Sequence, residues 1–248
     1  MASVEKEKRE NGIEVWTLNR PDKRNSLSIE LLQEFNRRLR EIDEQTRVIV
    51  LTGAGEVFCA GLDLSLLSNL TPAVCEAYMD AASGMYLGLI GCAVPTIAAI
   101  KGAAIAGGFD LSVMCDIRIS TPTAKFGQPE VRLALSGLTD PLWRIVGLGR
   151  AKELIYTGKI YDGQEAYRIG LVNQLADDPL AAALAMAAVI AANDPDAVRT
   201  EKHLTGQWPM ADARAAVEDQ LNTFSTFLLR PQTKARIAAH LATLGKKP

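Results

Sequence analysis

The stretch from Pro95 to Glu130 constrains the fold of this chain most strongly. It begins with a run of β-branched and small apolar residues, typical of a buried strand, and continues through Gly107-Gly108 into an apolar helix. A Gly-Gly pair directly before a helix can present unpaired backbone N–H groups to an anion. Two carboxylates, Asp110 and Glu130, follow the pair and are suited to moving protons beside that anion. The stretch therefore predicts oxyanion stabilisation next to a proton-transfer group, as the chemistry of a carbonyl or thioester requires.

A second glycine turn lies upstream of this stretch. Residues 48–52 form a β-branched run that predicts another buried strand. Gly53-Ala54-Gly55 follows it directly, and the segment 57–64, which contains Gly61, comes next. Two glycine loops that each follow a buried strand can converge on one point from two sides. Each turn alone is equally consistent with an ordinary connection, because Gly-rich strand-to-helix turns are common in α/β proteins.

Strands and helices alternate over the first two-thirds of the sequence. We expect strands at Ile13–Leu18, 48–52, Thr96–Ile100 and Ile117–Ser120. Apolar residues at helical spacing predict one helix over residues 29–42, capped by Ser28, and another over residues 75–90. This alternation predicts an α/β core.

After residue 149 the strand patterns largely stop. Helical patterns cover residues 150–156, 163–169, 178–193, 195–205, 210–228 and 231–244. We therefore divide the chain into an α/β core over residues 1–195 and a helical C-terminal region over residues 196–248. Such a region either caps its own core or packs on another subunit. An apolar group in it fits both arrangements and consists of Leu221, Phe224, Phe227, Leu228 and Leu229.

The composition is ordinary for a globular protein and argues against two kinds of partner. Of 248 residues, 48% are hydrophobic and 23% are charged, and the net charge is −2. Nucleic-acid binding usually needs a basic domain, and no apolar run approaches the roughly 20 residues that span a bilayer. We expect neither nucleic acid nor a membrane as a partner.

Cysteine and histidine usage indicates a reducing compartment and no metal site. Four cysteines show no paired spacing, and the N-terminal sequence lacks the apolar core of a signal peptide. We expect a cytoplasmic protein. The two histidines, His203 and His240, lie in the helical region without metal-ligand spacing, so no metal is expected.

The motifs resemble those of the enoyl-CoA hydratase/isomerase, or crotonase, family. The matching segments follow the family order over nearly the whole chain: RPDKRNSLS at 20–28, VFCAGLDL at 57–64, the stretch 95–130, ELIYTGKIYDGQEAYRIGLVNQ at 153–174 and the helical C-terminus. The resemblance implies a ClpP/crotonase-like spiral of ββα units with a helical C-terminal region. It also implies an acyl-CoA substrate, no cofactor apart from the coenzyme A of that substrate, and assembly as a homotrimer or hexamer. The family contains hydratases, isomerases, hydrolases, decarboxylases and dehalogenases, so the fold leaves the reaction open.

Within this resemblance, four residues correspond to reacting groups. The backbone amides of Leu62 and Gly107 match the two donors of the family's oxyanion hole, and Glu130 matches a catalytic glutamate. Asp110 matches the second carboxylate of hydratases, which is usually glutamate, and the shorter side chain draws the carboxylate back by about 1.5 Å. Dienoyl-CoA isomerases of the family also carry aspartate there, so hydration and isomerisation both stay open.

A second set of residues is expected to contact the coenzyme A part of the substrate. It comprises Lys23, Arg24, Ala60, Asp63, Leu64 and Gly108. Lys23 and Arg24 suit the phosphates of coenzyme A, and the loop over residues 60–65 would contact its adenine and pantetheine largely through the backbone. Structural roles remain open for several of these residues: a solvated face for Lys23-Arg24 and a hydrogen-bonded turn for Asp63. They also remain open for Asp110, as a first-turn acid of a helix, and for Glu130, as an exposed loop acid.

The segment after Glu130 departs from the family pattern. Many relatives have a Gly-rich P-G-x-G-G loop, whereas LALSGLTDPLWR at 133–144 is shorter and has few glycines. That loop borders the reacting end of the acyl chain in relatives. Thioester hydrolysis and carbon–carbon cleavage therefore remain alternatives. A noncatalytic crotonase-fold module that binds RNA or protein is an alternative of another class. Asp140, before Pro141, fits either a helix start or a third carboxylate.

Overall fold

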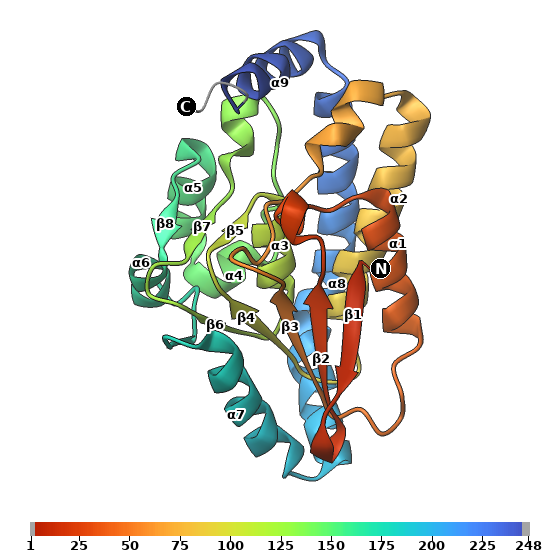
Figure 1. Cartoon of the computed structure of the whole chain (residues 1–248), viewed down its shortest axis with the longest axis vertical. Coiled ribbons are helices and arrows are strands. Elements are labelled where there is room, and N and C mark those ends of the chain that lie inside the picture. The colour runs from red at the N-terminus through yellow and green to blue at the C-terminus, as the bar shows by residue number, and fades with distance from the viewer. Residues whose placement is uncertain (1–2, 245–248) are drawn as a thin grey trace.

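A mostly parallel β-sheet forms the centre of the fold, and the computed structural model describes residues 3–244 (Figure 1). The strands are β1 (Val4–Lys8), β2 (Ile13–Leu18), β3 (Val48–Gly53), β4 (Thr96–Ile100), β5 (Ala103–Ile105), β6 (Ile117–Ser120), β7 (Lys125–Gly127), β8 (Tyr161–Asp162) and β9 (Gln174–Leu175). The α-helices are α1 (Ile29–Arg40), α2 (Pro72–Ile90), α3 (Gly107–Met114), α4 (Leu142–Val146), α5 (Leu148–Thr157), α6 (Gly163–Arg168), α7 (Pro179–Ala191), α8 (Pro195–Leu228) and α9 (Pro231–Leu244).

The strands form two sheets between which the chain passes repeatedly. The six-stranded sheet has the order β1-β2-β3-β4-β6-β9, with only β1 antiparallel to its neighbour, and the three-stranded sheet has the order β5-β7-β8. The chain crosses from the larger to the smaller sheet after β4 and again after β6. These repeated strand pairs confirm the predicted α/β spiral.

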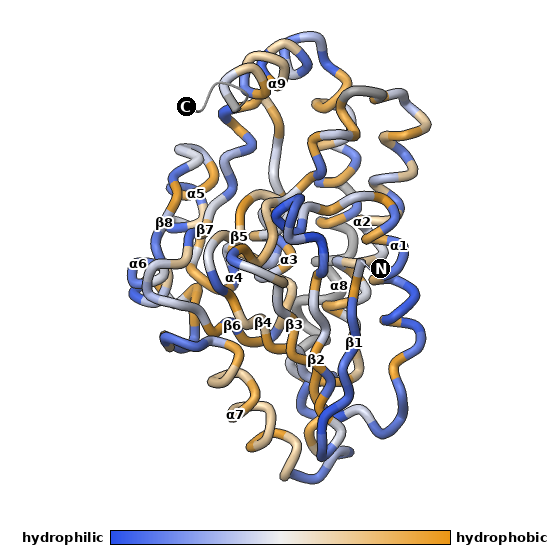
Figure 2. The backbone as a smooth tube through the Cα atoms, viewed as in Figure 1, coloured by the Kyte–Doolittle hydropathy of each residue, from blue (hydrophilic) through white to orange (hydrophobic). Residues whose placement is uncertain are grey.

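Both faces of the large sheet are buried, which explains why its central strands are apolar throughout. Ala183, Ala187 and Ala191 of α7 cover one face, where their small side chains let the helix approach the strands closely. The other face packs against α1, α2 and α3, and Trp16 of β2 meets Phe35 of α1 edge to face, with ring centroids 5.5 Å apart. Figure 2 shows the apolar colouring along α7 and the central strands. The sheet therefore carries helices on both of its faces.

Most predicted helices are confirmed, with bounds shifted by a few residues. Ser28 caps α1 as predicted, accepting a hydrogen bond from the Leu31 N–H at 3.3 Å. Thr71 caps α2, which starts three residues before the predicted residue 75. The prediction of two helices over 195–205 and 210–228 is wrong, because α8 runs without interruption and packs along α2.

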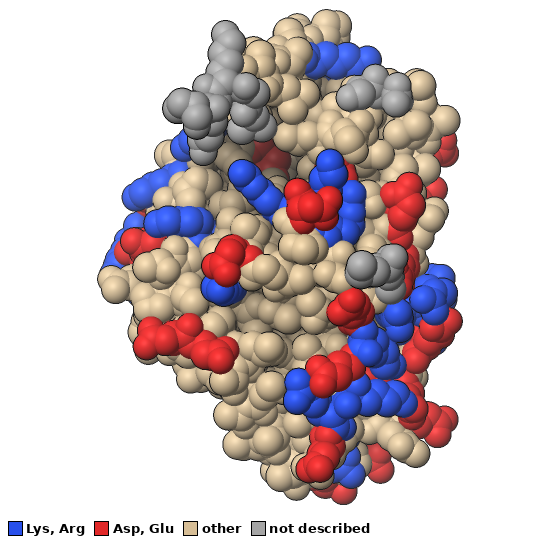
Figure 3. All heavy atoms as spheres, viewed as in Figure 1, with Lys and Arg blue, Asp and Glu red and all other residues tan. Residues whose placement is uncertain are grey.

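The helical C-terminal region covers its own core. Leu221 and Leu228 of α8 are buried within the chain, and Phe224 packs against the same core. Packing within the chain therefore accounts for these apolar residues without a contact to another subunit. On the face shown in Figure 3, acidic and basic residues are interspersed.

No single helix in the part of the chain that the structure describes has both the length and the apolar character to cross a membrane. α7 and residues 195–205 of α8 satisfy such a test only when joined, and they meet at 109°.

Candidate active site

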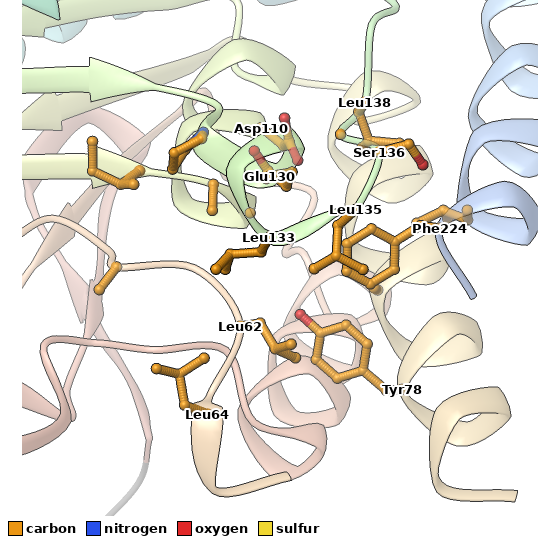
Figure 4. A pocket seen from close by; sticks show the side chains of 18 of the residues that line it. Leu62, Leu64, Tyr78, Asp110, Glu130, Leu133, Leu135, Ser136, Leu138 and Phe224 are labelled. Carbon is orange, nitrogen blue, oxygen red and sulfur yellow. The ribbon is translucent and has the colours of Figure 1, made fainter. Parts of the chain in front are cut away.

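A largely apolar cavity of about 200 Å³ lies beside the N-terminus of α3 (Figure 4). The loop before α2, α2 itself and the segment after the 3₁₀-helix Pro129–Leu133 supply most of its wall. Phe224 of α8 and Ile237 of α9 close it from the C-terminal region. The cavity is therefore completed by the tail of the same chain.

The two glycine loops of the sequence meet at this cavity. Gly61 adopts φ +87°, and the loop around it is fastened by hydrogen bonds from the Leu27 N–H to the Gly61 oxygen at 2.8 Å and from the Asp63 N–H to the Leu27 oxygen at 3.1 Å. A Cβ atom at Gly61 would lie 3.0 Å from the Gly107 nitrogen, so the two loops are in direct backbone contact. The convergence predicted from the sequence is confirmed.

Two backbone amides are left available at this junction. Leu62 and Gly107 both line the cavity, and their N–H groups have no hydrogen-bond acceptor among residues 3–244. Ala106 precedes α3 with φ 54° and ψ −129°, a conformation that L residues rarely adopt and that costs about 1–3 kcal/mol. This turn makes Gly107 the first residue of α3, where the helix dipole is positive. The junction can therefore stabilise an oxyanion.

Gly108 permits close packing rather than lining the cavity. A Cβ atom there would collide with the backbone carbonyl of Cys59. Cys59 is joined to β5 by hydrogen bonds from its N–H to the Ala103 oxygen at 3.0 Å and from the Ile105 N–H to its own oxygen at 3.1 Å. The glycine thus sets the distance between the two loops.

Two buried carboxylates face the same cavity. Asp110 of α3 and Glu130 of the 3₁₀-helix are each 6% exposed, and Figure 4 shows both at one end of the cavity. The Gln128 amide nitrogen donates to Asp110 Oδ1 and to the backbone oxygen of Leu138. Glu130 Oε2 is buried without a partner in the described part of the chain. Gln128 therefore holds the Asp110 carboxylate, whereas Glu130 Oε2 has no hydrogen-bond donor among the described residues.

Burial sets the protonation of this pair. It raises the pKa of Asp110 well above the usual value, and the neighbouring Glu130 charge raises it further. Burial also raises the pKa of Glu130 to about 7. The two carboxyl groups therefore titrate as an interacting pair above the ordinary carboxylate range, and Glu130 can exchange a proton near neutral pH.

The segment that departs from the family pattern packs directly on the carboxylates. A Cβ atom at Gly137 would lie 3.1 Å from the Gln128 amide nitrogen and 3.4 Å from the Glu130 carboxyl carbon. The Thr139 N–H donates to Gln220 Oε1 of α8 at 2.7 Å. The segment is therefore held between the acid pair and the tail.

Asp140 takes neither of its predicted roles. Its carboxylate is buried, pairs with the Arg144 guanidinium at 2.9 Å and accepts from the Trp143 indole at 3.1 Å. It does not line the cavity, and α4 has no side-chain cap. Asp140 instead links the first turn of α4 to the preceding segment.

The residues expected to contact coenzyme A divide into two groups. Ala60 and Leu64 line the cavity. Asp63 lies outside it and forms a partly buried ion pair with Arg20 at 2.7 Å. It also accepts the Ser65 N–H at 3.0 Å and so caps the 3₁₀-helix Leu64–Asn69. Asp63 thus supports the turn that carries Leu62, as its structural alternative predicts.

Lys23 and Arg24 lie exposed at the 3₁₀-helix Pro21–Lys23, away from the carboxylates. The Arg24 backbone oxygen accepts the Ala60 N–H at 3.1 Å, which places the basic pair beside a residue of the cavity wall.

Two residues with evident roles at the site, Gln128 and Ala106, are not among the predicted ones. The G-Q-P-E sequence places Gln128 two residues before the predicted glutamate, and this proximity is the signal that points to it. Ala106 carries no such signal, because an alanine rarely adopts positive φ. No group of three or more His, Cys, Asp or Glu residues within 3–244 is arranged to hold a metal ion.

Comparisons with known proteins agree with this geometry. The family model described as enoyl-CoA hydratase/isomerase matches residues 8–238. The chain is 35% identical over 233 residues to a short-chain-enoyl-CoA hydratase of Clostridium acetobutylicum, covering 87% of this chain and 86% of the relative. It is 31% identical over 241 residues to a crotonyl-CoA hydratase of Syntrophomonas wolfei, covering 94% and 93%.

Among solved structures, an enoyl-CoA hydratase/isomerase from Mycobacterium paratuberculosis superimposes with a TM-score of 0.90 at 28% identity, covering 96% of this chain and 98% of that one. The chain belongs to the enoyl-CoA hydratase/isomerase (crotonase) family and is an acyl-CoA-processing enzyme of that family.

Proposed function

We propose that this protein adds water across the double bond of a short-chain 2-enoyl-CoA. The observation that carries the proposal is the pair of buried carboxylates with raised pKa values, which lies beside two backbone amides that have no acceptor among the described residues. The printed names of the two bacterial relatives, both hydratases, support the same reaction.

The two amides act on the thioester carbonyl. As water attacks, negative charge moves onto the carbonyl oxygen, and the N–H groups of Leu62 and Gly107 stabilise it. Loss of one such donor typically costs about 2.7–4 kcal/mol of transition-state stabilisation. The positive end of α3 adds to the same effect.

The two carboxylates move the protons. Glu130 takes a proton from water while the water oxygen bonds to the β-carbon, and the carbon–carbon double bond becomes single. The proton on Asp110 passes to the α-carbon, which yields a 3-hydroxyacyl-CoA. Glu130 is then protonated and Asp110 is ionised. When the product leaves, proton exchange with solvent restores the starting state of both groups. The hydrogen bond from the Gln128 amide keeps the Asp110 side chain, which is shorter than a glutamate, in position.

Cavity size supports a short acyl group. A cavity of about 150 Å³ holds a benzene molecule, so about 200 Å³ suits an acyl chain of about four to six carbons. Phe224 and Ile237 block longer extension toward the tail.

Double-bond isomerisation is the second candidate, because a single carboxylate with a pKa near 7 can shuttle one proton between the γ- and α-carbons. Thioester hydrolysis is a third, since the altered 133–144 segment packs on Glu130. A noncatalytic module is disfavoured, because burying two carboxylates in one cavity destabilises the fold and brings no benefit to a protein that does not use them for catalysis.

We also propose that Lys23 and Arg24 bind the phosphates of coenzyme A and that the enzyme works in the cytoplasm. The exposed position of the basic pair beside Ala60 supports the first proposal, and the free, buried state of all four cysteines supports the second.

Replacing Glu130 by glutamine tests the reaction. Glu130→Gln should lower turnover by about 10²–10⁴-fold, the usual contribution of a general acid–base group, and leave acyl-CoA affinity nearly unchanged. Mass spectrometry of products from a panel of enoyl-CoAs, with calorimetry for binding, measures both. Gain of one water supports hydration, whereas an unchanged mass with a moved double bond, or free coenzyme A, would replace it with isomerisation or hydrolysis.

The rate should depend on pH through Glu130. Because the ionised form is the base and burial raises its pKa to about 7, kcat/KM should rise as pH increases through about 7. Asp110→Asn should lower kcat by about 10²–10⁴-fold, yet leave this limb near 7, because burial is the main cause of the Glu130 shift. If kcat/KM of the wild type instead rises through pH about 4–5, the ordinary carboxylate range, Glu130 with a raised pKa is not the base.

The oxyanion geometry should tolerate no side chain at Gly108. Gly108→Ala should reduce kcat/KM by about 10²-fold or more, because the clash with Cys59 separates the two loops. Gly149→Ala is the matched control, since a Cβ atom there meets nothing within 4 Å, and its kcat/KM should equal that of the wild type. Circular dichroism verifies that both variants fold, and equal activity of the two would refute this role for the loop contact.

We further propose a homotrimer, or a hexamer of two trimers. Membership of the family supports it, and so do large exposed apolar side chains such as Tyr156 at 71% and Val189 at 70% exposure, which subunit contacts would cover. Light scattering at micromolar concentration should give three or six times the chain mass of 26.8 kDa. A mass equal to one chain would disprove the assembly.

A further inference from the structure

Tyr78 presents a polar group to an otherwise apolar part of the cavity. The residue lies on α2, is 6% exposed and lines the cavity, and Figure 4 shows its hydroxyl directed inward toward Leu62. Within residues 3–244 this hydroxyl has no hydrogen-bond partner. A buried tyrosine hydroxyl normally has one, so this one is available to a ligand.

Tyr86 shows what a structural tyrosine does at the same wall. It lies two helical turns further along α2 and also lines the cavity, but its hydroxyl donates to the Gly107 oxygen at 3.1 Å. Its hydroxyl proton is therefore already used to hold α3. The difference between the two tyrosines identifies the Tyr78 hydroxyl as the unused one.

An acyl chain that fills the cavity removes the water that can satisfy Tyr78. A plain hydrocarbon chain then leaves a buried hydroxyl without a partner, which is unfavourable, whereas an oxygen on the chain restores the hydrogen bond. A site that hydrogen-bonds a substrate hydroxyl discriminates strongly against the analogue without it for this reason.

We propose that the acyl group of the preferred substrate carries an uncharged oxygen, as a hydroxyl or carbonyl, beyond the reacting double bond, and that Tyr78 binds it. The proposal rests on the proposed acyl-CoA function and specifies its substrate class. The oxygen is uncharged because Asp110 and Glu130 share the cavity, while its described lining contains no Lys or Arg to balance a carboxylate. His240 of α9 is the one lining residue that can carry positive charge, and it is largely exposed.

Among the described lining residues, Ser136 carries the other hydroxyl that has no hydrogen-bond partner, so it is the competitor for this role. Its oxygen is buried without a partner, but it is sealed within the wall and is not accessible from the cavity. Tyr78 therefore has the better access to a ligand.

Binding of saturated acyl-CoAs tests the proposal without depending on the reaction. The probes are 4-hydroxybutanoyl-, 5-hydroxypentanoyl- and 6-hydroxyhexanoyl-CoA, each paired with the chain in which methyl replaces the hydroxyl. By calorimetry, the wild type should bind the hydroxyl member of at least one pair about 10-fold more tightly, as one good hydrogen bond allows. Tyr78→Phe should reduce that preference to about one. Glutaryl-CoA, which ends in a carboxylate, should bind more weakly than the preferred hydroxyl compound.

Two matched variants locate the effect. Tyr86→Phe should weaken both members of a pair equally and keep their ratio, and Ser136→Ala should also keep it. Equal binding within every pair in the wild type, the same preference in Tyr78→Phe, or tightest binding of glutaryl-CoA would overturn the proposal. A preference lost only in Ser136→Ala would reassign the oxygen site and refute the role of Tyr78. If no acyl-CoA binds at all, the proposed function itself fails, which is a different result from equal binding within pairs.

Discussion

The active geometry depends on the close approach of two backbone segments, residues 59–62 and 105–108. Gly61 and Gly108 stand at the contact, and a Cβ atom at either would reach the opposing backbone. This approach needs no side chain, yet it places two amides together and starts α3 at Gly107. The backbone conformation of Ala106 is the strained element that completes the turn, and the hydrogen bonds between Cys59 and β5 hold it in place.

The other end of α3 is fixed by a buried cation. Arg118 is 3% exposed, and its guanidinium donates to the backbone oxygens of Cys115 at 2.7 Å and Leu171 at 2.6 Å. Burial lowers the pKa of Arg118 from its usual value, but the group remains the natural partner for carbonyls at a helix C-terminus. α3 is thus held at both ends, so Asp110 on its first turn has little freedom to move away from Glu130.

Sequence patterns predicted the local features of the structure, and the glycine motifs predicted features of the cavity that join distant segments. The central strands, the Ser28 cap, the loop convergence and the two carboxylates on the cavity all lie where the sequence indicates. Short strands such as β5 and β7, of three residues each, carry too little pattern and form only because partners hold them. Asp140 also could not be placed from local pattern alone. A carboxylate before a proline is typical of a helix cap, but in the structure the Arg144 side chain binds it instead.

The altered segment after Glu130 and the tail form one coupled wall. Gln220 of α8 accepts the Thr139 N–H, and the Thr233 hydroxyl of α9 donates to the Ala134 oxygen at 3.0 Å. Gln128 links the same segment to Asp110 through the Leu138 oxygen. A change in the tail can therefore reach the acid pair through three hydrogen-bonded steps of backbone and side chain. The helices that close the cavity are thus part of the support for its two carboxylates.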